Sequence, residues 1–151
     1  MRAFRIADSR FPIFDGTGAR LVGGRWNSPG HSLIYASETF AGAVLEILVH
    51  ANLNRVPPRH AFIEIRIPKS VRVESIAPAD LPGWDKADLR ASRGFGDRWI
   101  GERRSCVLLA PSIVTGGHER NVLINPEHTD FRQISASDAT PVRWDQRLFK
   151  R

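Results

Sequence analysis

Four segments of the sequence carry side chains that could bind or react with a ligand. The first, residues 23–30, is rich in glycine and holds Arg25 next to Trp26. Glycines on both sides permit a tight backbone and the close approach of a ligand. Arginine grips phosphate through its planar fork, and an aromatic ring can stack on a planar base. The alternative is a structural turn, with Trp26 in the core and Arg25 in solvent.

The second segment contains Glu46, which interrupts the apolar run 43–49. On a helical wheel Glu46 lies about 120° from Phe40, on the flank of the apolar stripe. Gly42, one turn earlier, leaves the surface beside Glu46 uncovered, because helical side chains lean toward the N-terminus. A carboxylate beside a gap suits contact with a ligand. The alternative is a surface glutamate that pairs with His50 at i+4.

The other two segments are 110–112 and 121–128. Ser112 follows a short apolar stretch, at a strand end of the kind where functional residues gather, although Pro-Ser turns are also common. Asn121 and Asn125 could fix turns or contact a ligand. Tyr35 is the only tyrosine of the chain, and it either packs on the core or belongs to the site.

Several catalytic classes are not represented in the sequence. It contains no Walker loop, no dinucleotide-binding G-x-G-x-x-G after a strand, no G-x-S-x-G and no H-E-x-x-H. The five histidines lack metal-ligand spacing, so we expect no metal site. Cys106 is the only cysteine, which rules out an internal disulfide and fits a reducing compartment. It lies in an apolar run and is expected to be a core residue.

The hydrophobic pattern predicts the elements that position these residues. A helix over 38–51 is expected, capped by Ser37 and with Phe40, Ala43 and Ile47 on its apolar face. Two helical pieces are expected within 85–104, broken at the glycines and with Asp97 as a cap. Strands are predicted at 32–36, 61–67, 71–75, 106–110, 122–124 and 131–134, and a loop at 15–30. Residues 2–7 are expected to form a short strand or a first turn. The mixed order favours an α+β fold with mixed or antiparallel sheets and flanking helices.

Length and composition fit a soluble globular chain. A length of 151 residues suits a single domain, 1–151. No apolar run is long enough to span a bilayer and no secretory signal is evident, so we expect a cytoplasmic protein. The net charge is +6, and 19 of the 22 basic residues are arginine. Such an excess attracts nucleic acids, acidic proteins or phosphorylated small molecules, although a bias toward arginine codons is the plainer explanation.

Taken together, the segments GGRWNSPG, IYAS, AVLEILVH, APSIV and RNVLINPEH closely resemble the RES domain family in order and spacing. FRIA near the start and GFGDRWIGE in the middle extend the match over nearly the whole chain. By this resemblance Arg25, Glu46 and Ser112 are the name-giving residues, and Tyr35 is a further catalytic residue. The residues expected to bind NAD are Arg25, Tyr35, Trp26, Asn27 and Asn121.

The resemblance implies the fold of ADP-ribosyltransferases of the diphtheria-toxin type. It also implies a bacterial toxin that depletes NAD by hydrolysis or phosphorolysis of the nicotinamide glycosidic bond. NAD would be the substrate, with no separate cofactor. The partner would be an Xre-like helix-turn-helix antitoxin that blocks the NAD cleft. Transfer of ADP-ribose to a protein is the alternative with the same fold.

Two further alternatives rank below NAD consumption, although the charge of +6 would also suit the first of them, an RNase toxin. An RNase toxin needs a pair of acid–base groups, which no clear histidine pair supplies. A non-catalytic nucleic-acid-binding module needs exposed aromatics, whereas the four tryptophans are expected to be buried. We therefore expect no direct nucleic-acid binding and no membrane contact.

Each site residue has an expected physical role. Glu46 would stabilise the cation that forms on the ribose when the glycosidic bond breaks. Arg25 suits the pyrophosphate or the adenosine ribose, and Tyr35 could stack on nicotinamide. Ser112 could orient Arg25 or the nicotinamide amide. Nicotinamide leaves as a neutral ring, so a dedicated general acid is unnecessary.

Overall fold

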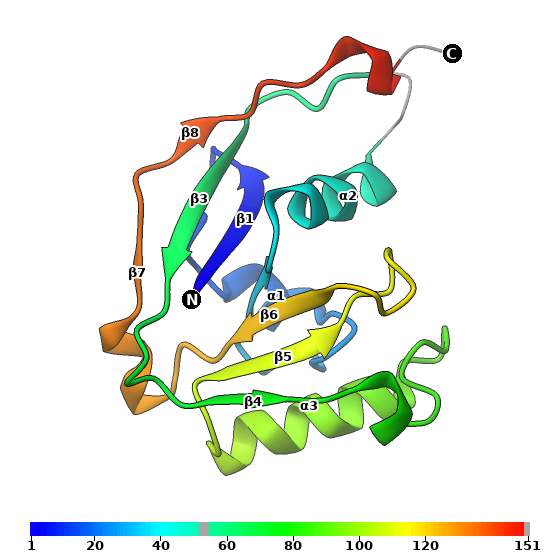
Figure 1. The fold of residues 1–151 in the computed structure, drawn as a ribbon, viewed down its shortest axis with the longest axis vertical. Helices are drawn as coiled ribbons and strands as arrows, with labels where there is room; N and C mark the ends of the chain where they lie inside the picture. Colours follow the sequence, from blue (N-terminus) through cyan, green and yellow to red (C-terminus); the bar gives the residue numbers. More distant parts are fainter. Residues whose placement is uncertain (52–54, 150–151) are drawn as a thin grey trace.

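One mixed β-sheet runs through the molecule in Figure 1, a computed structural model that describes residues 1–51 and 55–149. Its strands are β1 Arg2–Asp8, β2 Ile34–Ser37, β3 His60–Arg66, β4 Val73–Ser75, β5 Val107–Pro111, β6 Arg120–Ile124, β7 Ser135–Ala136 and β8 Thr140–Pro141. Hydrogen-bonded neighbours follow the order β4, β5, β6, β2, β1, β3 and β7, and β8 also pairs with β3. Only β4 and β5 are parallel to each other among these described pairs.

Three α-helices flank this sheet, which confirms the predicted α+β class. They are α1 Thr17–Val22, α2 Phe40–His50 and α3 Arg90–Glu102, and short 3-10 helices are η1 Pro78–Asp80, η2 Thr129–Gln133 and η3 Gln146–Phe149. α2 contacts β1 and β2. α3 buries Trp99 and Ile100 in one cluster with residues of β5 and β6. Within the described residues, none of the helices has the length and apolar content needed to span a bilayer.

The central strands bury both of their faces, as the continuous apolar run at 106–110 predicts. Along β5, Val107 and Leu109 join a cluster on one face, whereas Leu108 and Ala110 join a second cluster on the other. The first cluster also takes the inward-facing isoleucines of β3. The second includes Trp26, Trp84 and Trp99. These three tryptophans are therefore core residues, as expected, whereas Trp144, for which burial was also expected, is only partly buried.

Cys106 lies in the first of these clusters and is completely buried. Its Sγ is 3.7 Å from the carbonyl oxygen of Asn125. Burial raises the pKa of the thiol to about 12, with a smaller contribution from the charge of Asp130. A thiol that stays protonated at neutral pH is a poor nucleophile, so the expectation that Cys106 is a core residue is confirmed.

The sheet is held together unevenly, and its weakest junction lies between β1 and β2. β1 pairs with β3 along its whole length, from Arg2 to Asp8. β1 and β2 share a single register pair, Phe4 with Ser37. On its other side β2 pairs with β6 along all of its residues. The two halves of the sheet therefore separate between β1 and β2.

The start of α2 differs from the sequence prediction. Ser37 is the last residue of β2, and Thr39 is the N-cap, whose hydroxyl accepts a hydrogen bond from Gly42 N at 2.9 Å. Thr39 also donates to Glu119 Oε2 at 2.9 Å. A Cβ on Gly42 would lie 3.0 Å from that same oxygen. Gly42 is thus a point of close packing for the helix start, and the open gap predicted beside Glu46 is not at this residue.

Three other predicted segments also differ. The glycine-rich stretch 15–30 contains α1, because residues 17–22 include good helix formers between the glycines. Residues 131–134 are mostly in η2 and not in a strand. α3 continues through Gly94 and Gly96 without a break. Asp97 does not cap a helix, since its carboxylate accepts from the backbone N and Oγ of Ser28, at 2.8 and 2.6 Å.

Gly96 is the point at which α3 meets the loop 23–30. A Cβ at this position would overlap the carbonyl oxygen of Trp26. Because that atom belongs to the backbone, it can move only if the loop moves. Position 96 therefore requires glycine because of tertiary packing, although glycine has a low helix propensity.

We expect Gly96→Ala to destabilise the fold by at least about 2 kcal/mol, because the added methyl overpacks a backbone contact. Gly94→Ala is the matched control in the same helix, since a Cβ there meets nothing within 4 Å. It should stabilise the protein by about 0.5–1 kcal/mol. Urea unfolding of both variants measures the difference. Equal free energies of unfolding for the two variants would show that Gly96 does not pack closely against the backbone of the loop 23–30.

Candidate active site

A cleft with a volume of about 790 Å³ opens where β1 and β2 separate. Its walls come from both of these strands, from the helices α1, α2 and α3, and from the loops that follow α1 and β5. Sites for small molecules and cofactors commonly have about 300–1,000 Å³. The cleft brings together five residues that the sequence selected, namely Arg25, Trp26, Tyr35, Glu46 and Asn121.

The carboxylate of Glu46 accepts hydrogen bonds from two side chains that lie outside its own helix. Ser112 Oγ donates to Glu46 Oε1 at 3.2 Å, and Asn121 Nδ2 donates to the same oxygen at 3.0 Å. Ser112 is 3% exposed, so its hydroxyl is committed to this contact. Glu46 Oε2 has no hydrogen-bond partner among the described residues. The carboxylate is thus fixed through one oxygen and presents the other to the cleft.

This arrangement decides between two sequence interpretations. Glu46 turns toward Ser112 and Asn121, and no contact with His50 is found among the described residues. Ser112 contacts Glu46, and no hydrogen bond joins it to Arg25 among the described residues. The other role expected for Ser112, orienting the nicotinamide amide, stays a prediction. The donors lie at the end of β5 and the start of β6, where Asn121 pairs with Ala110 and with Ser37.

Tyr35 fixes the loop 23–30 through its hydroxyl. The oxygen accepts from Trp26 N at 2.9 Å and donates to Asn27 Oδ1 at 2.7 Å. A Cβ on Gly24 would lie 2.5 Å from the same hydroxyl oxygen, so glycine is required there. Burial raises the pKa of Tyr35 well above its ordinary value, which the hydrogen bond from Trp26 N and the charge of Arg93 only partly offset.

Trp26 and Asn27 are completely buried. The amide of Asn27 donates to the carbonyl oxygens of Ala19 and His31, each at 2.9 Å. The expectation that these two side chains contact a ligand does not fit this conformation. They act inside the loop, and the alternative stated for Trp26, a plug in the core, describes its position better.

Arg25 lies on the cleft wall and is partly exposed. Its Nη1 donates to the carbonyl oxygens of Trp84 and Lys86, at 3.0 and 3.1 Å. Both acceptors are neutral, so the contacts orient the guanidinium without cancelling its charge. The remaining nitrogens of the fork have no protein partner among the described residues and can meet a ligand.

Two further arginines on the cleft were not selected from the sequence. Arg5 on β1 donates from Nε to Ile13 O at 2.7 Å and from Nη1 to Tyr35 O at 2.6 Å. Burial lowers the pKa of its guanidinium, and the charge of Asp15 offsets part of that effect. Arg93 on α3 donates from Nε to Gly24 O at 2.8 Å. FRIA belonged to the family match, but nothing in its spacing indicated that Arg5 would reach β2.

The three arginines that line the cleft form no ion pair among the described residues. Within residues 1–51 and 55–149, the cleft residues Arg5, Arg25 and Arg93 have no carboxylate within 4.0 Å. Elsewhere some arginines form close ion pairs, for example Arg10 with Asp8 and Arg147 with Asp145, both at 2.6 Å, and others form none. The cleft is distinguished by holding three guanidiniums together with no carboxylate within 4.0 Å of any of them, which makes it a site for an anion.

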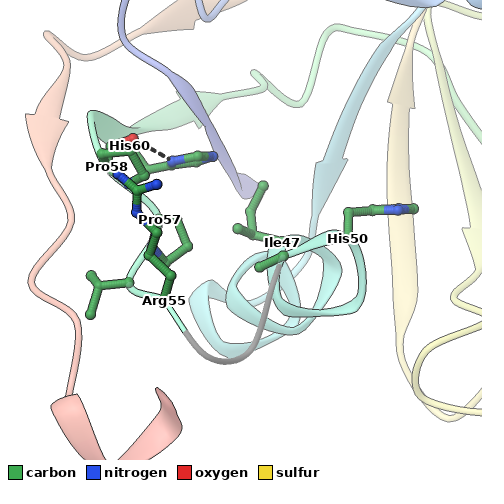
Figure 2. Close-up of a pocket in the computed structure, with 8 residues that line it drawn as sticks. Ile47, His50, Arg55, Pro57, Pro58 and His60 are labelled. Carbon is green, nitrogen blue, oxygen red and sulfur yellow. Dashed lines mark hydrogen bonds between the residues drawn. The ribbon is translucent and has the colours of Figure 1, made fainter.

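A smaller pocket of about 310 Å³ adjoins the cleft beyond α2, with Ile47 and His50 in both linings. Figure 2 shows Arg55 and His60 on the far side of this pocket, and the ring of His50 points away from them. His60 Nδ1 is 3.0 Å from Pro58 O. No group of three His, Cys, Asp or Glu side chains in the described part of the chain could hold a metal ion.

Comparison with known proteins identifies relatives over almost the whole chain. Residues 2–145 match the model of the RES domain. A protein of Sphingobium sp. named Prs ADP-ribosylating toxin is 37% identical over 140 residues, which cover 90% of this chain and 86% of the relative. A protein of Pseudomonas putida named Toxin Res is 32% identical over 145 residues, with 93% and 96% covered.

The fold also has a counterpart among solved structures. The crystal structure of the M. tuberculosis MbcT–MbcA toxin–antitoxin complex contains a chain that superposes with a TM-score of 0.76 at 16% identity. The match covers 93% of this chain and 83% of that one. At this identity the likeness concerns the fold.

The burial of Tyr35 makes a direct prediction about pH, because it is the only tyrosine. In the native protein the phenol should ionise well above its ordinary pKa of about 10. A raised folded-state pKa stabilises the fold fully below pH ~10, and that contribution is lost as pH rises through the folded-state value. Ultraviolet absorbance of the phenolate during an alkaline titration measures this. The chain in urea is the control and should titrate near 10, and the same midpoint in both states would contradict the buried hydroxyl.

Proposed function

The chain belongs to the RES domain family, and we propose that it is a bacterial toxin that cleaves the bond between nicotinamide and ribose in NAD. Names given to its relatives support the toxin part of this proposal. The chemistry of the cleft supports the substrate. A single oriented carboxylate stands in a cleft that otherwise carries unpaired cations. NAD combines an anionic diphosphate with a ribose that becomes cationic when the bond breaks.

The orientation of Glu46 is the observation that carries the proposal. When the glycosidic bond breaks, its electron pair moves to the nicotinamide nitrogen, and positive charge develops on the ribose ring. A carboxylate fixed before the reaction stabilises that charge without reorganising. Ser112 and Asn121 provide the fixation through Oε1, which leaves Oε2 to face the ribose or accept from one of its hydroxyls. Water or phosphate then adds to the anomeric carbon and loses a proton.

Arginines at the cleft would bind the phosphates. Arg25 offers the unpaired part of its fork, and a charge-assisted hydrogen bond to phosphate is among the stronger polar contacts. Arg5 stands deeper, at the junction of β1 and β2, and adds positive potential where water is partly excluded. We assign Arg25 to direct contact with the diphosphate and Arg5 to the same anion from the floor of the cleft.

Tyr35 would contribute through its ring. The hydroxyl is occupied by the loop 23–30, so it is not available to donate a proton to a leaving group. The ring lines the cleft and can stack on nicotinamide, which leaves as a neutral molecule. The hydroxyl of Tyr35 would thus hold the loop 23–30, and the face of its ring would hold nicotinamide.

Transfer of ADP-ribose to a protein is the second candidate. It is favoured by the relative named Prs ADP-ribosylating toxin and by the apolar mouth of the cleft. Val22 and Val49 line the cleft and are 75% and 62% exposed. Exposed apolar residues around a polar site commonly mark protein contacts. The same Glu46 would then act on a ribose whose acceptor is a side chain.

We also assign this mouth to the antitoxin. A partner that covers Val22, Val49 and Ile113 would bury an apolar rim and close the entrance for NAD. Acidic side chains on the partner would be attracted by the unpaired arginines and by the net charge of +6. An Xre-like helix-turn-helix protein is the partner that the family resemblance implies, and nucleic acid would be contacted by that partner.

Glu46→Gln should lower NAD cleavage by roughly 100-fold or more, because the shape is kept and the charge at the reacting ribose is lost. The measurement is NAD turnover by the purified protein, together with NAD content after induction in a bacterium. Glu127→Gln is the matched control, since Glu127 is exposed and remote from the cleft lining. It should cleave NAD at the wild-type rate. Normal turnover by Glu46→Gln would refute the proposed role.

Arg25→Ala in the same assay separates binding from chemistry. Loss of a phosphate contact should raise KM roughly tenfold or more, with kcat largely retained. Loss of kcat at unchanged KM would instead place Arg25 at the reacting carbon.

In cells that express the wild-type protein, growth arrest with steady NAD would favour ADP-ribosylation of a protein over NAD depletion.

Val22→Asp should weaken binding of the antitoxin by roughly tenfold or more, because a charge is placed in an apolar contact. Leu45→Asp on α2 is the control, since Leu45 is 43% exposed but does not line the cleft. Calorimetric titration with the purified antitoxin measures both affinities. Equal affinities for Val22→Asp and the wild type would place the antitoxin on another surface.

A further inference from the structure

Arg93 reaches the cleft from α3 and touches the loop 23–30 from outside. Its Nε donates to the carbonyl oxygen of Gly24, 69 residues away in the sequence. Nη1 and Nη2 have no hydrogen-bond partner among the described residues. These two nitrogens are not buried, since the buried side-chain atoms without a partner in the described residues are Trp26 Nε1 and Asn125 Nδ2. Both terminal nitrogens of Arg93 are therefore accessible to solvent, and Arg93 is one of the residues that line the cleft.

The loop is built to accommodate this side chain. Gly23 has a φ of +73°, and a Cβ there would lie 3.0 Å from Arg93 Nη2 and 2.9 Å from Pro29 Cδ. Gly24 makes room for the hydroxyl of Tyr35 in the same way. The two positions before Arg25 therefore favour glycine for different reasons. A side chain at position 23 would crowd Arg93, and one at position 24 would crowd Tyr35.

The surroundings of Arg93 contain no anion to match its charge. No carboxylate lies within 4.0 Å of the guanidinium in the described part of the chain. Arg98, five residues further along α3, is exposed and does not line the cleft. Arg93 and Arg98 therefore differ in access to the cleft and in the hydrogen bond to Gly24 O.

From these contacts we infer that Arg93 is a second diphosphate-binding residue, which grips the nucleoside diphosphate part of the substrate through Nη1 and Nη2. The inference rests on the proposed function. Arg25 follows Gly24 directly in the sequence, and both arginines line the same cleft. The diphosphate of NAD carries two negative charges, and two guanidinium forks can each meet a phosphate.

The bond from Nε to Gly24 O prepares Arg93 for this role. It fixes the plane of the guanidinium before a ligand arrives, so less side-chain freedom is lost on binding. The same bond also supports the loop. An experiment must therefore separate contact with phosphate from positioning of Arg25 and Tyr35.

Calorimetric titration with ADP and with adenosine makes this separation, because the two probes differ only in the diphosphate. Arg93→Gln should weaken ADP binding roughly tenfold or more and leave adenosine binding unchanged. Arg93→Lys keeps the charge without the fork and should lose less. Arg98→Gln on the same helix is the matched control and should bind ADP as the wild type does.

Two results would overturn the inference without touching the proposed function. ADP binding by Arg93→Gln at wild-type strength would show that no phosphate contact exists. Equal losses for ADP and adenosine in both Arg93 variants would show that the residue only positions the loop. Failure of the wild-type protein to bind or cleave NAD would instead refute the proposed function, on which the assignment of a diphosphate depends.

Discussion

The site depends on the separation of β1 from β2. A sheet whose strands paired fully here would have no cleft, because backbone hydrogen bonds would close the space. The single register pair at Phe4 and Ser37 leaves backbone groups of β2 without a strand partner. Arg5 supplies part of what the ladder lacks, since its Nη1 donates to Tyr35 O. One side chain thus spans the opening, satisfies the strand edge and brings a positive charge to the floor of the cleft.

The loop 23–30 is placed by contacts from two elements, β2 and α3. Tyr35 on β2 holds it from below, and α3 holds it through Arg93 Nε and through the carboxylate of Asp97. Gly96 lets the helix approach the backbone of Trp26. These contacts hold the loop in one conformation and so fix the backbone from which Arg25 projects. Rigid placement of the groups around a reacting centre is what electrostatic catalysis requires.

Local pattern was a good guide where burial alternates simply. The alternation of Ile63 and Ile65 predicted a half-buried strand, and the apolar run through Leu108 predicted one buried on both faces. Glu46 was recognisable because a charge in an apolar helix stands out. The interpretation of Trp26 as a ligand contact was less secure, because a tryptophan beside glycines can either stack on a ligand or fill the core.

Contacts between distant segments account for what the sequence did not reveal. Propensity places breaks at Gly94 and Gly96, whereas packing on the loop keeps the helix continuous and makes one of these glycines necessary. Arg5 and Arg93 look like ordinary surface arginines in a chain with many of them. Their role follows from what lies opposite, a strand edge in one case and a backbone carbonyl in the other, and neither is visible from local spacing.

The order of the site residues along the chain has a consequence during synthesis. Glu46 leaves the ribosome long before Ser112 and Asn121, and α3 emerges between them. A nascent chain that stops short of Asn121 lacks a donor that fixes the carboxylate and the whole of β6, on which β2 is paired. The cleft can therefore be completed only when most of the protein has been made. If the finished chain cleaves NAD as proposed, the activity would appear only late in translation, once the donors that fix the carboxylate have been made.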